Sequence, residues 1–404
     1  MQNHTEVVVT GLGAITPLGA NVSKTWEALL AGRSGIRAAD AIVPGLVAGL
    51  VAADPAEKLT PVQVKRLDRS QQFAAVAAAE AWADAGFESV DPERLAVAIG
   101  TGIGGVESLL REHDVLAESG VRRVSPRTVP MLMPNAAAAV VSIEYGAQAG
   151  VYTPVSACSS GAEAIALGAR LIRAGEADIV IAGGTEAAIT PITIAGFTQA
   201  RALAKPLGDA AEASRPFATD RNGFVIGEGA AVVILESAAH AAARSARVHA
   251  VLAGAGIASD AHHMTAPAPD GRGQIQAMRR SLAQAVLEPG GIAHVNAHAT
   301  GTPVGDAAEA RAIAEVFGPG ITVTAPKGAL GHLFGGAGAI EALLTVLAVR
   351  DGVIPPTHNL TPQNLDPDID LDVAIERRDL PQPAALSNSF GFGGQNVSLV
   401  FRRA

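Results

Sequence analysis

Short apolar runs and amphipathic runs alternate along the whole chain. Consecutive apolar residues at 7–11, 95–100 and 178–184 each predict a strand that is buried on both faces. Segments with the apolar spacing of a helix lie at 23–32, 71–86 and 158–175. Strands that alternate with helices in this way are typical of parallel sheets covered by helices. The pattern therefore predicts an α/β protein.

Two pairs of segments resemble each other. VVVTGLGAIT (7–16) is similar to AVLAGAGIAS (250–259). The segments that begin at Cys158 and at His332 both continue through a Gly/Ala-rich turn into a helix that closes at a glycine. We interpret this as two similarly built halves, 1–245 and 246–404. No Ser/Pro-rich linker separates the halves, so we expect them to share one packed body.

Composition narrows the class of protein. The chain has 404 residues, 49% of them hydrophobic and only 3% aromatic, which indicates a large core of closely packed small side chains. The most apolar stretch, 128–143, contains Pro130 and Pro134 and is shorter than the about 20 residues of a membrane span. The polar N-terminus lacks an export signal and a single cysteine cannot form an intrachain disulfide, so we expect a cytoplasmic protein. A net charge of −9 argues against nucleic acid as a partner.

Cys158 is the first candidate for chemistry. It lies in TPVSACSSGAEAIA, where a strand exit is followed at once by small residues and a helix. The N-terminus of a helix favours a thiolate through the macrodipole and its free N–H groups. This position predicts a nucleophile, although a lone cysteine can equally be a small buried hydrophobic residue.

Three further residues strengthen that prediction. His298 ends a strand in VNAHATGTPVGD, and Lys327 and His332 lie on the glycine-rich loop APKGALGHLFGG. Histidines in glycine-flanked loops are less easily explained as core residues than histidines on a helix face. His294 and His298 do not form a zinc pair, because residues four apart in a strand are about 13 Å apart.

These motifs together resemble those of the elongating β-ketoacyl-[acyl carrier protein] synthases. The resemblance covers nearly the whole chain, from VVVTGLGAITPLG to NSFGFGGQNVSLVF, and its most specific motifs are ACSSG, NAHATGTPVGD, PKGALGH and GFGG. Such enzymes condense acyl chains with malonyl units in fatty acid and type II polyketide synthesis. The resemblance implies a thiolase-like fold, in which two related α/β halves form five layers, and usually a homodimer.

The resemblance also implies roles for the candidate residues. Cys158 would accept the acyl group, and His298 and His332 would promote loss of CO2 from the malonyl thioester and stabilise the enolate. Lys327 would assist with Glu341 as its acidic partner. The division of labour between the two histidines stays open.

The late GFGG motif and the threonines carry further expectations. The backbone N–H groups of Cys158 and Phe392 would form the oxyanion hole, and the Phe392 ring would act as a gate to the acyl pocket. Thr300 and Thr302 match positions that contact the pantetheine arm. Gln395 departs from the family pattern, where threonine or histidine is expected.

The partner implied by the family is an acidic acyl carrier protein, whose phosphopantetheine arm makes a cofactor of the enzyme's own unnecessary. An acidic synthase needs a local basic patch to bind this partner. The candidates are Lys65, Arg66, Arg69, Arg201 and Lys205. Each of them can also be an ordinary solvated charge.

Three alternative functions compete with this prediction. IGTGIGG (99–105) contains the GxGxxG pattern of dinucleotide-binding oxidoreductases, but no strand ending in an acidic residue appears about 20 residues later. A non-catalytic partner subunit that shapes a chain-length tunnel would lack the nucleophile, and this chain retains Cys158. A thiolase would need a second catalytic cysteine.

Overall fold

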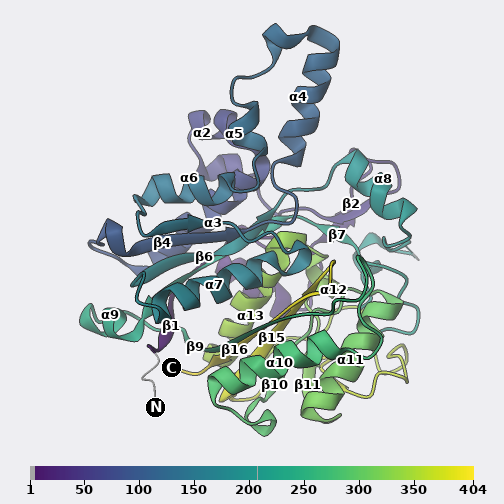
Figure 1. The fold of residues 1–404 in the computed structure, drawn as a ribbon. Coiled ribbons are helices and arrows are strands. Elements are labelled where there is room, and N and C mark those ends of the chain that lie inside the picture. The colour runs from purple at the N-terminus through teal and green to yellow at the C-terminus, as the bar shows by residue number, and fades with distance from the viewer. Residues whose placement is uncertain (1–4, 207) are drawn as a thin grey trace.

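The computed structural model describes residues 5–206 and 208–404, which form a layered body with one projecting arm (Figure 1). Eleven strands make one continuous sheet in the order β13-β11-β10-β15-β16-β9-β1-β8-β6-β4-β5. Their bounds are β1 Val7–Ile15, β4 Leu95–Gly100, β5 Gly150–Tyr152, β6 Ile179–Glu186, β8 Gly229–Ser237, β9 Ala250–Ser259, β10 His294–Asn296, β11 Thr322–Thr324, β13 Asp372–Val373, β15 Ala384–Gly391 and β16 Gln395–Arg402.

The same strand order occurs twice in this sheet. Read toward the centre, one half is β5-β4-β6-β8-β1, and the other is β11-β10-β15-β16-β9 with β13 added at its outer edge. The halves join where β1 pairs with β9, through Val8 with Val251 and Val9 with Ala250. The two similar segments of the sequence are therefore neighbouring strands at the centre of the molecule.

The expectation of parallel sheets is right only for the outer strands. β5, β4 and β6 are parallel in one half and β13, β11, β10 and β15 are parallel in the other, whereas β8 and β16 run antiparallel to both of their neighbours. An apolar run that is buried on both faces reports its burial and not its direction, so the sequence pattern could not distinguish the two arrangements.

Helices cover both outer faces of the sheet and also fill the space between its halves (Figure 1). α3 (Arg69–Ala85) and α6 (Ala136–Tyr145) cover the first half, and α10 (Arg272–Ala285) and α11 (Pro303–Phe317) cover the second. α7 (Ser160–Arg173) and α13 (Ala337–Asp351) lie between them. The result is the five-layer arrangement of helix, sheet, helix, sheet, helix.

The middle layer needs small residues. Every residue of α13 from Ala337 to Val349 is buried, because this helix has protein on all sides. A side chain on Gly338 would bring its Cβ within 2.8 Å of the backbone nitrogen of Ala162 in α7. The abundance of glycine and alanine in the sequence thus reflects the close approach of α7 and α13.

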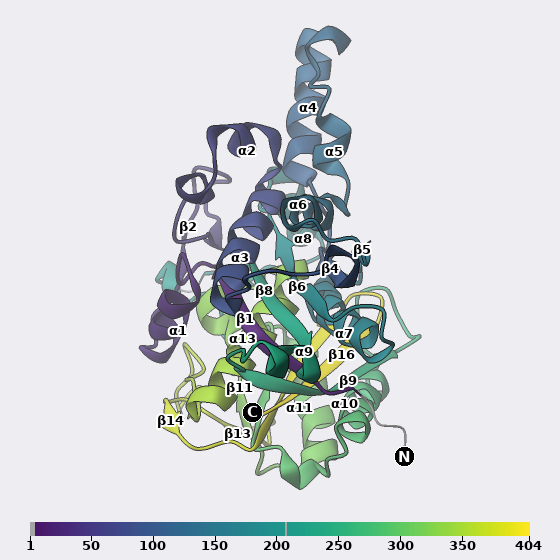
Figure 2. The same cartoon turned by 90° about the vertical axis from the view of Figure 1, so that its left-hand side faces the viewer.

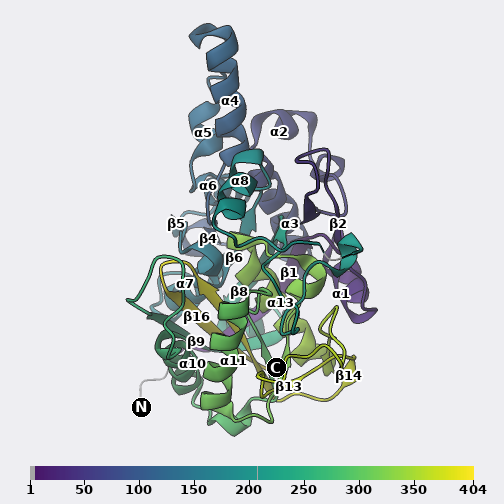
Figure 3. The same ribbon diagram turned by 90° about the vertical axis from the view of Figure 1, so that its right-hand side faces the viewer.

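The remaining elements decorate this body. An arm made of α4 (Val106–Ser119) and α5 (Thr128–Leu132) projects from it in all three views (Figures 2 and 3). The other helices are α1 (Val22–Leu30), α2 (Pro61–Arg66), α8 (Pro191–Gln199), α9 (Ala238–Ala243) and α12 (Lys327–Leu330), and the small sheets contain β2 (Ile36–Ala38), β3 (Val47–Gly49) and β7 (Ile226–Gly227), and β12 (Val353–Ile354) and β14 (Arg378–Asp379). Among the described residues, no helix has the length and apolar character needed to cross a membrane.

Candidate active site

A strained turn places Cys158 at the start of α7. The 3₁₀ turn Ala157–Ser159 runs directly into this helix, and Ala157 has a positive φ of 51°. The Ser160 hydroxyl fixes the turn by donating to the carbonyl of Ala157 at 2.7 Å and accepting from the backbone N–H of Ser156 at 2.9 Å. A left-handed conformation at a residue with a side chain costs of order 1–3 kcal/mol, and such strain clusters at functional sites.

Burial outweighs the effect that the helix N-terminus has on the Cys158 thiol. Burial raises the pKa of the Cys158 thiol to about 12. The charge of Lys327 and hydrogen bonds from the backbone N–H groups of Phe392 and Cys158 lower this pKa, but by less than burial raises it. The sulfur therefore carries its proton at neutral pH, while the two N–H groups of the predicted oxyanion hole converge beside it.

Hydrogen bonds from backbone N–H groups to a buried glutamate hold the loop that carries His298. The loop that follows β10 carries it, and the backbone N–H groups of His298 and Ala299 donate to the carboxylate of Glu309 at 2.8 and 2.7 Å. Glu309 is buried in α11, and burial raises its pKa to about 7. No sequence motif marks this glutamate, because it lies within an ordinary helical stretch.

Lys327 sets the hydrogen-bonding state of His298. Its buried ammonium group pairs with the carboxylate of Glu341 and lies 3.4 Å from Nδ1 of His298. An ammonium group can only donate hydrogen bonds, so Nδ1 must accept. A neutral His298 consequently carries its hydrogen on Nε2.

Both histidines are neutral at physiological pH. Burial and the charge of Lys327 lower the pKa values of His298 and His332 well below the ordinary value. The two rings lie 5.3 Å apart between centroids at an angle of 87°. Backbone hydrogen bonds fix His332, which donates to the carbonyl of Val225 at 2.7 Å and accepts from the N–H of Gly227 at 2.8 Å.

One cavity of about 580 Å³ brings these groups together. It is lined by Cys158 and both histidines, and also by Thr300 and Thr302, whose hydroxyl oxygens are 3.1 Å apart. Lys327 and Glu341 do not line the cavity but lie behind His298, which does. A thiol, two neutral imidazoles and two backbone donors around one cavity can carry out acyl transfer and stabilise an oxyanion.

Phe392 lies in the turn between β15 and β16. Its side chain is 40% exposed and lines the cavity, so it is not a core phenylalanine. Gly393 and Gly394 follow it with φ of 80° and 72°, a conformation that favours glycine. Gln395 begins β16, where it pairs with Ser259 of β9.

A group of aromatic rings forms another wall of the cavity. Phe334 stacks on Phe197 with centroids 5.2 Å apart, and both lie edge-on to Phe224. The ring of His332 lies 4.9 Å from that of Phe334. This wall could not be recognised from the sequence, since the three phenylalanines are far apart in the chain.

The GxGxxG pattern at 100–105 binds a carboxylate of the protein itself. Backbone N–H groups of Gly102 and Ile103 donate to Glu186, at 2.7 and 3.3 Å. These donors are the groups that hold a pyrophosphate in a dinucleotide-binding protein. Because Glu186 occupies them, the oxidoreductase alternative has no phosphate site here.

The predicted carrier patch divides into three parts. Lys65 and Arg66 are exposed on α2 but do not line the cavity. Arg69 forms an ion pair with the buried Glu228 at 2.7 Å, which neutralises its charge and removes it from the patch. Arg201 and Lys205 are exposed, and Arg201 lines the cavity.

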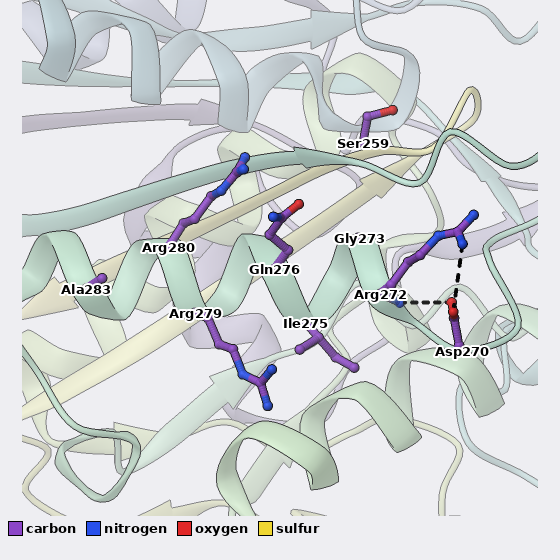
Figure 4. Close-up of a pocket in the computed structure, with 9 residues that line it drawn as sticks. All are labelled: Ser259, Asp270, Arg272, Gly273, Ile275, Gln276, Arg279, Arg280 and Ala283. Atoms are coloured by element: carbon purple, nitrogen blue, oxygen red, sulfur yellow. Dashed lines mark hydrogen bonds and ion pairs between the residues drawn. The ribbon is translucent and has the colours of Figure 1, made fainter.

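A second, more open depression of about 680 Å³ runs along α10 (Figure 4). Arg272, Arg279 and Arg280 line it, and Figure 4 shows Arg279 and Arg280 on opposite sides of the helix. Arg272 lies near Asp270, Arg279 pairs with Glu315 at 3.1 Å, and Arg280 donates to the carbonyl of Ile257 at 2.5 Å. These arginines are largely paired with neighbours, and among the described residues neither cysteine nor histidine lines the depression.

Comparisons with known proteins agree with the geometry of the cavity. Sequence models of the β-ketoacyl synthase N-terminal and C-terminal domains match residues 4–241 and 249–361. The chain is 48% identical to a 3-oxoacyl-[acyl-carrier-protein] synthase 2 of Mycobacterium tuberculosis, over 98% of this chain and 97% of the relative. It is 42% identical to a protein of the same name from Coxiella burnetii, over 98% of both chains.

Solved structures with the same fold are also ketosynthases. The ishigamide ketosynthase/chain length factor superposes with a TM-score of 0.92 at 32% identity, covering 99% of this chain and all of the other. A β-ketoacyl synthase from Burkholderia phymatum gives a TM-score of 0.90 at 34% identity with the same coverage. The chain belongs to the β-ketoacyl synthase family and is a condensing enzyme of fatty acid or polyketide synthesis with a thiolase-like fold.

Proposed function

We propose that Cys158 carries the acyl chain during condensation. The observation that supports this most strongly is the convergence of the cysteine, two neutral histidines and two backbone N–H groups on one cavity. In the first half-reaction, the sulfur attacks the carbonyl carbon of an acyl thioester. The C–S bond to the pantetheine arm breaks, and the departing thiolate takes up the proton that Cys158 loses.

The backbone N–H groups of Cys158 and Phe392 would hold the oxyanion of this step. Both already donate toward the sulfur, so they need little reorganisation to reach the oxygen of a carbonyl group whose carbon is bonded to that sulfur. This arrangement also provides a means of activating a thiol whose pKa burial has raised. As the sulfur attacks, its proton moves to the leaving group and no free thiolate accumulates.

The second half-reaction uses the histidines. The carboxylate of a malonyl thioester leaves as CO2, and the electron pair of the broken C–C bond remains as an enolate. The Nε2 hydrogen of His298 and the imidazole of His332 would stabilise the enolate oxygen. The enolate carbon then attacks the acyl carbonyl, a C–C bond forms, and the C–S bond to Cys158 breaks to release the 3-oxoacyl thioester. The departing Cys158 thiolate takes up a proton from solvent water, which restores the thiol.

Lys327 and Glu341 would act as positioning residues. The lysine keeps Nδ1 of His298 as an acceptor, which leaves the Nε2 hydrogen free to face the cavity. Glu341 compensates the buried charge of Lys327. An ammonium group without this partner would be costly to bury.

The substrates would arrive on an acyl carrier protein. Thr300 and Thr302 would bind the pantetheine arm through their hydroxyl groups, which line the cavity. Arg201, Lys205, Lys65 and Arg66 would contact the acidic carrier. A related structure, a ketosynthase with its acyl carrier protein, has a TM-score of 0.91 to this chain. The absence of any other cofactor and the cytoplasmic location stay predictions.

We propose that the enzyme is a homodimer of chains with two halves, 1–245 and 246–404. The twofold repeat of the strand order supports the division. β5 forms one edge of the large sheet, and its Val151 is 43% exposed. Ile143 on the neighbouring α6 is 81% exposed. An open strand edge beside exposed apolar side chains is typical of a surface that a second copy covers.

Mass spectrometry of the acyl-enzyme tests the proposal. Incubation with an acyl carrier protein that bears a saturated chain should add one acyl mass, located on the peptide that contains Cys158. Addition of malonyl carrier protein should discharge it as the 3-oxoacyl product. Cys158→Ala should take up no acyl group. Acyl transfer to another residue, or condensation by the variant, would refute the assignment.

A further inference from the structure

Glu186 is a fully buried carboxylate that the condensation mechanism does not use. It ends β6, the central strand of the first half, and its exposed fraction is 0%. It has no lysine, arginine or histidine as an ion-pair partner among the described residues, in contrast to Glu228 and Glu341. Four hydrogen-bond donors surround it instead.

These donors come from two separate loops. In the glycine loop (residues 101–105), the hydroxyl of Thr101 donates to Glu186 at 3.0 Å, together with the two backbone N–H groups described above. In the histidine loop (residues 331–336), the backbone N–H of Gly335 donates to the same carboxylate at 3.1 Å. A single side chain therefore bridges segments that are more than 200 residues apart in the chain.

The two loops meet closely around this carboxylate. A Cβ on Gly335 would lie 2.3 Å from the backbone nitrogen of Gly102, and a Cβ on Gly102 would lie 2.7 Å from Oε2 of Glu186. The glycines are thus required for contact between the loops and for access of the N–H groups to the carboxylate. This explains the glycine pattern that resembles a dinucleotide motif.

Both loops line the cavity that contains Cys158. The glycine loop contributes Gly102 and Ile103, and the histidine loop contributes His332 and Phe334. Phe334 has a positive φ of 44°, so this loop needs outside contacts to hold its conformation. Burial raises the pKa of Glu186 to about 7, against the effect of its four donors.

We propose that Glu186 is a positioning residue that joins the glycine loop to the histidine loop and thereby controls which acyl chains Cys158 accepts. The inference rests on the proposed role of Cys158 as the acyl carrier. Displacement of either loop changes the shape of the wall that the acyl chain contacts. A change of about one methylene in an apolar pocket is worth a factor of about 10–200 in selectivity, so small shifts suffice.

The test uses Glu186→Gln in the full-length enzyme. The amide keeps the shape of the side chain but replaces one acceptor oxygen with a donor that faces N–H groups. Initial rates of Cys158 acylation are measured by mass spectrometry for a series of acyl carrier proteins that bear saturated acyl chains of different lengths. The ratio of the rates for the longest and shortest accepted chains should change at least about fivefold, which corresponds to about 1 kcal/mol.

A matched control separates positioning from general stability. Glu80 also accepts two backbone N–H groups, from Ala14 and Val22 at 2.9 Å each, but it does not line the cavity. Glu80→Gln should lower the melting temperature and leave the ratio of acylation rates unchanged. If Glu80→Gln shifts the ratio as much as Glu186→Gln does, the effect is general loosening and the inference is wrong.

A milder variant covers the case in which Glu186→Gln does not fold. Thr101→Val removes one donor to Glu186 and keeps the volume of the side chain, whereas Thr101→Ser keeps the hydroxyl. Thr101→Val should shift the ratio of acylation rates in the same direction as Glu186→Gln, and Thr101→Ser should leave it unchanged. A wild-type ratio in Thr101→Val, and in Glu186→Gln where it folds, would overturn the inference. Failure of the wild-type enzyme to acylate Cys158 would instead refute the proposed function.

Discussion

Replacing Lys327 with methionine removes the donor that keeps His298 in one tautomer. The ammonium group lies 3.4 Å from Nδ1 of His298, and no other described residue donates to that atom. Without it the ring hydrogen can move to Nδ1, and Nε2 then accepts and cannot stabilise the enolate. Loss of one preorganised oxyanion donor typically costs about 10²–10³ in rate, so we expect that decrease in malonyl decarboxylation.

The same substitution affects stability through Glu341. Burial raises the pKa of Glu341 to about 7 from 4.5 even with Lys327 beside it. At 1.36 kcal/mol per pKa unit, this rise corresponds to roughly 3 kcal/mol of folding stability. That stability is lost once the pH exceeds the pKa of Glu341 in the folded protein. A carboxyl whose folded pKa is raised binds more protons folded than unfolded, so its contribution to stability falls as the pH rises from about 4.5 through the folded pKa. Loss of the cation raises that folded pKa further.

Lys327→Met should therefore lose more stability relative to wild type at pH 8.5 than at pH 6. Thermal unfolding at both pH values measures this, and the rate of CO2 release from malonyl carrier protein measures the catalytic loss. Lys24→Met on the exposed face of α1 is the control and should change neither. Normal CO2 release by Lys327→Met, or a stability loss that does not depend on pH, would refute this account of the lysine.

Three further predictions concern the groups that line the cavity. The rate of Cys158 alkylation by iodoacetamide should still rise above pH 9, because burial raises the thiol pKa to about 12, and a plateau below pH 8 would contradict this. His298→Ala should slow decarboxylation by about 10²–10³ while sparing acylation, and equal losses in both steps would count against its role. Phe392→Ala should alter the acyl-chain profile with little change in melting temperature, since its ring is 40% exposed, whereas a large stability loss with an unchanged profile would assign it to packing.

Much of the fold could be predicted from periodicity. The apolar run at 95–100 is the strand β4, and the helix expected at 71–86 is α3, Arg69–Ala85. The spacing of apolar residues lies within each segment, so it can be recognised without knowing which distant segments cover it. The direction of the strands was not predictable in the same way, because the antiparallel β8 (GAAVVILES) shows the same apolar run as the parallel β4 (LAVAIG).

The residues of the cavity could be predicted only where they lie in a distinctive motif. Cys158, His298 and His332 each stand at the end of a strand or on a loop before a helix, where glycines mark an unusual backbone. Glu309 lies within a helix and carries no such mark. Glu186 ends β6 just after Gly183 and Gly184, but the importance of both glutamates comes from N–H groups that other loops bring to them, which no local motif reveals. The raised pKa of the thiol likewise depends on burial by segments far away in the chain, which a helix N-terminus does not reveal.

The proposed mechanism has two half-reactions, which share one cavity and use different groups. The most direct test compares CO2 release from malonyl carrier protein by Cys158→Ala and by Cys158→Ala combined with His298→Ala. The single variant should still release CO2, since both histidines remain, and the double variant should lose that activity by about 10²–10³. Equal rates in the two variants would contradict the assignment of enolate stabilisation to His298.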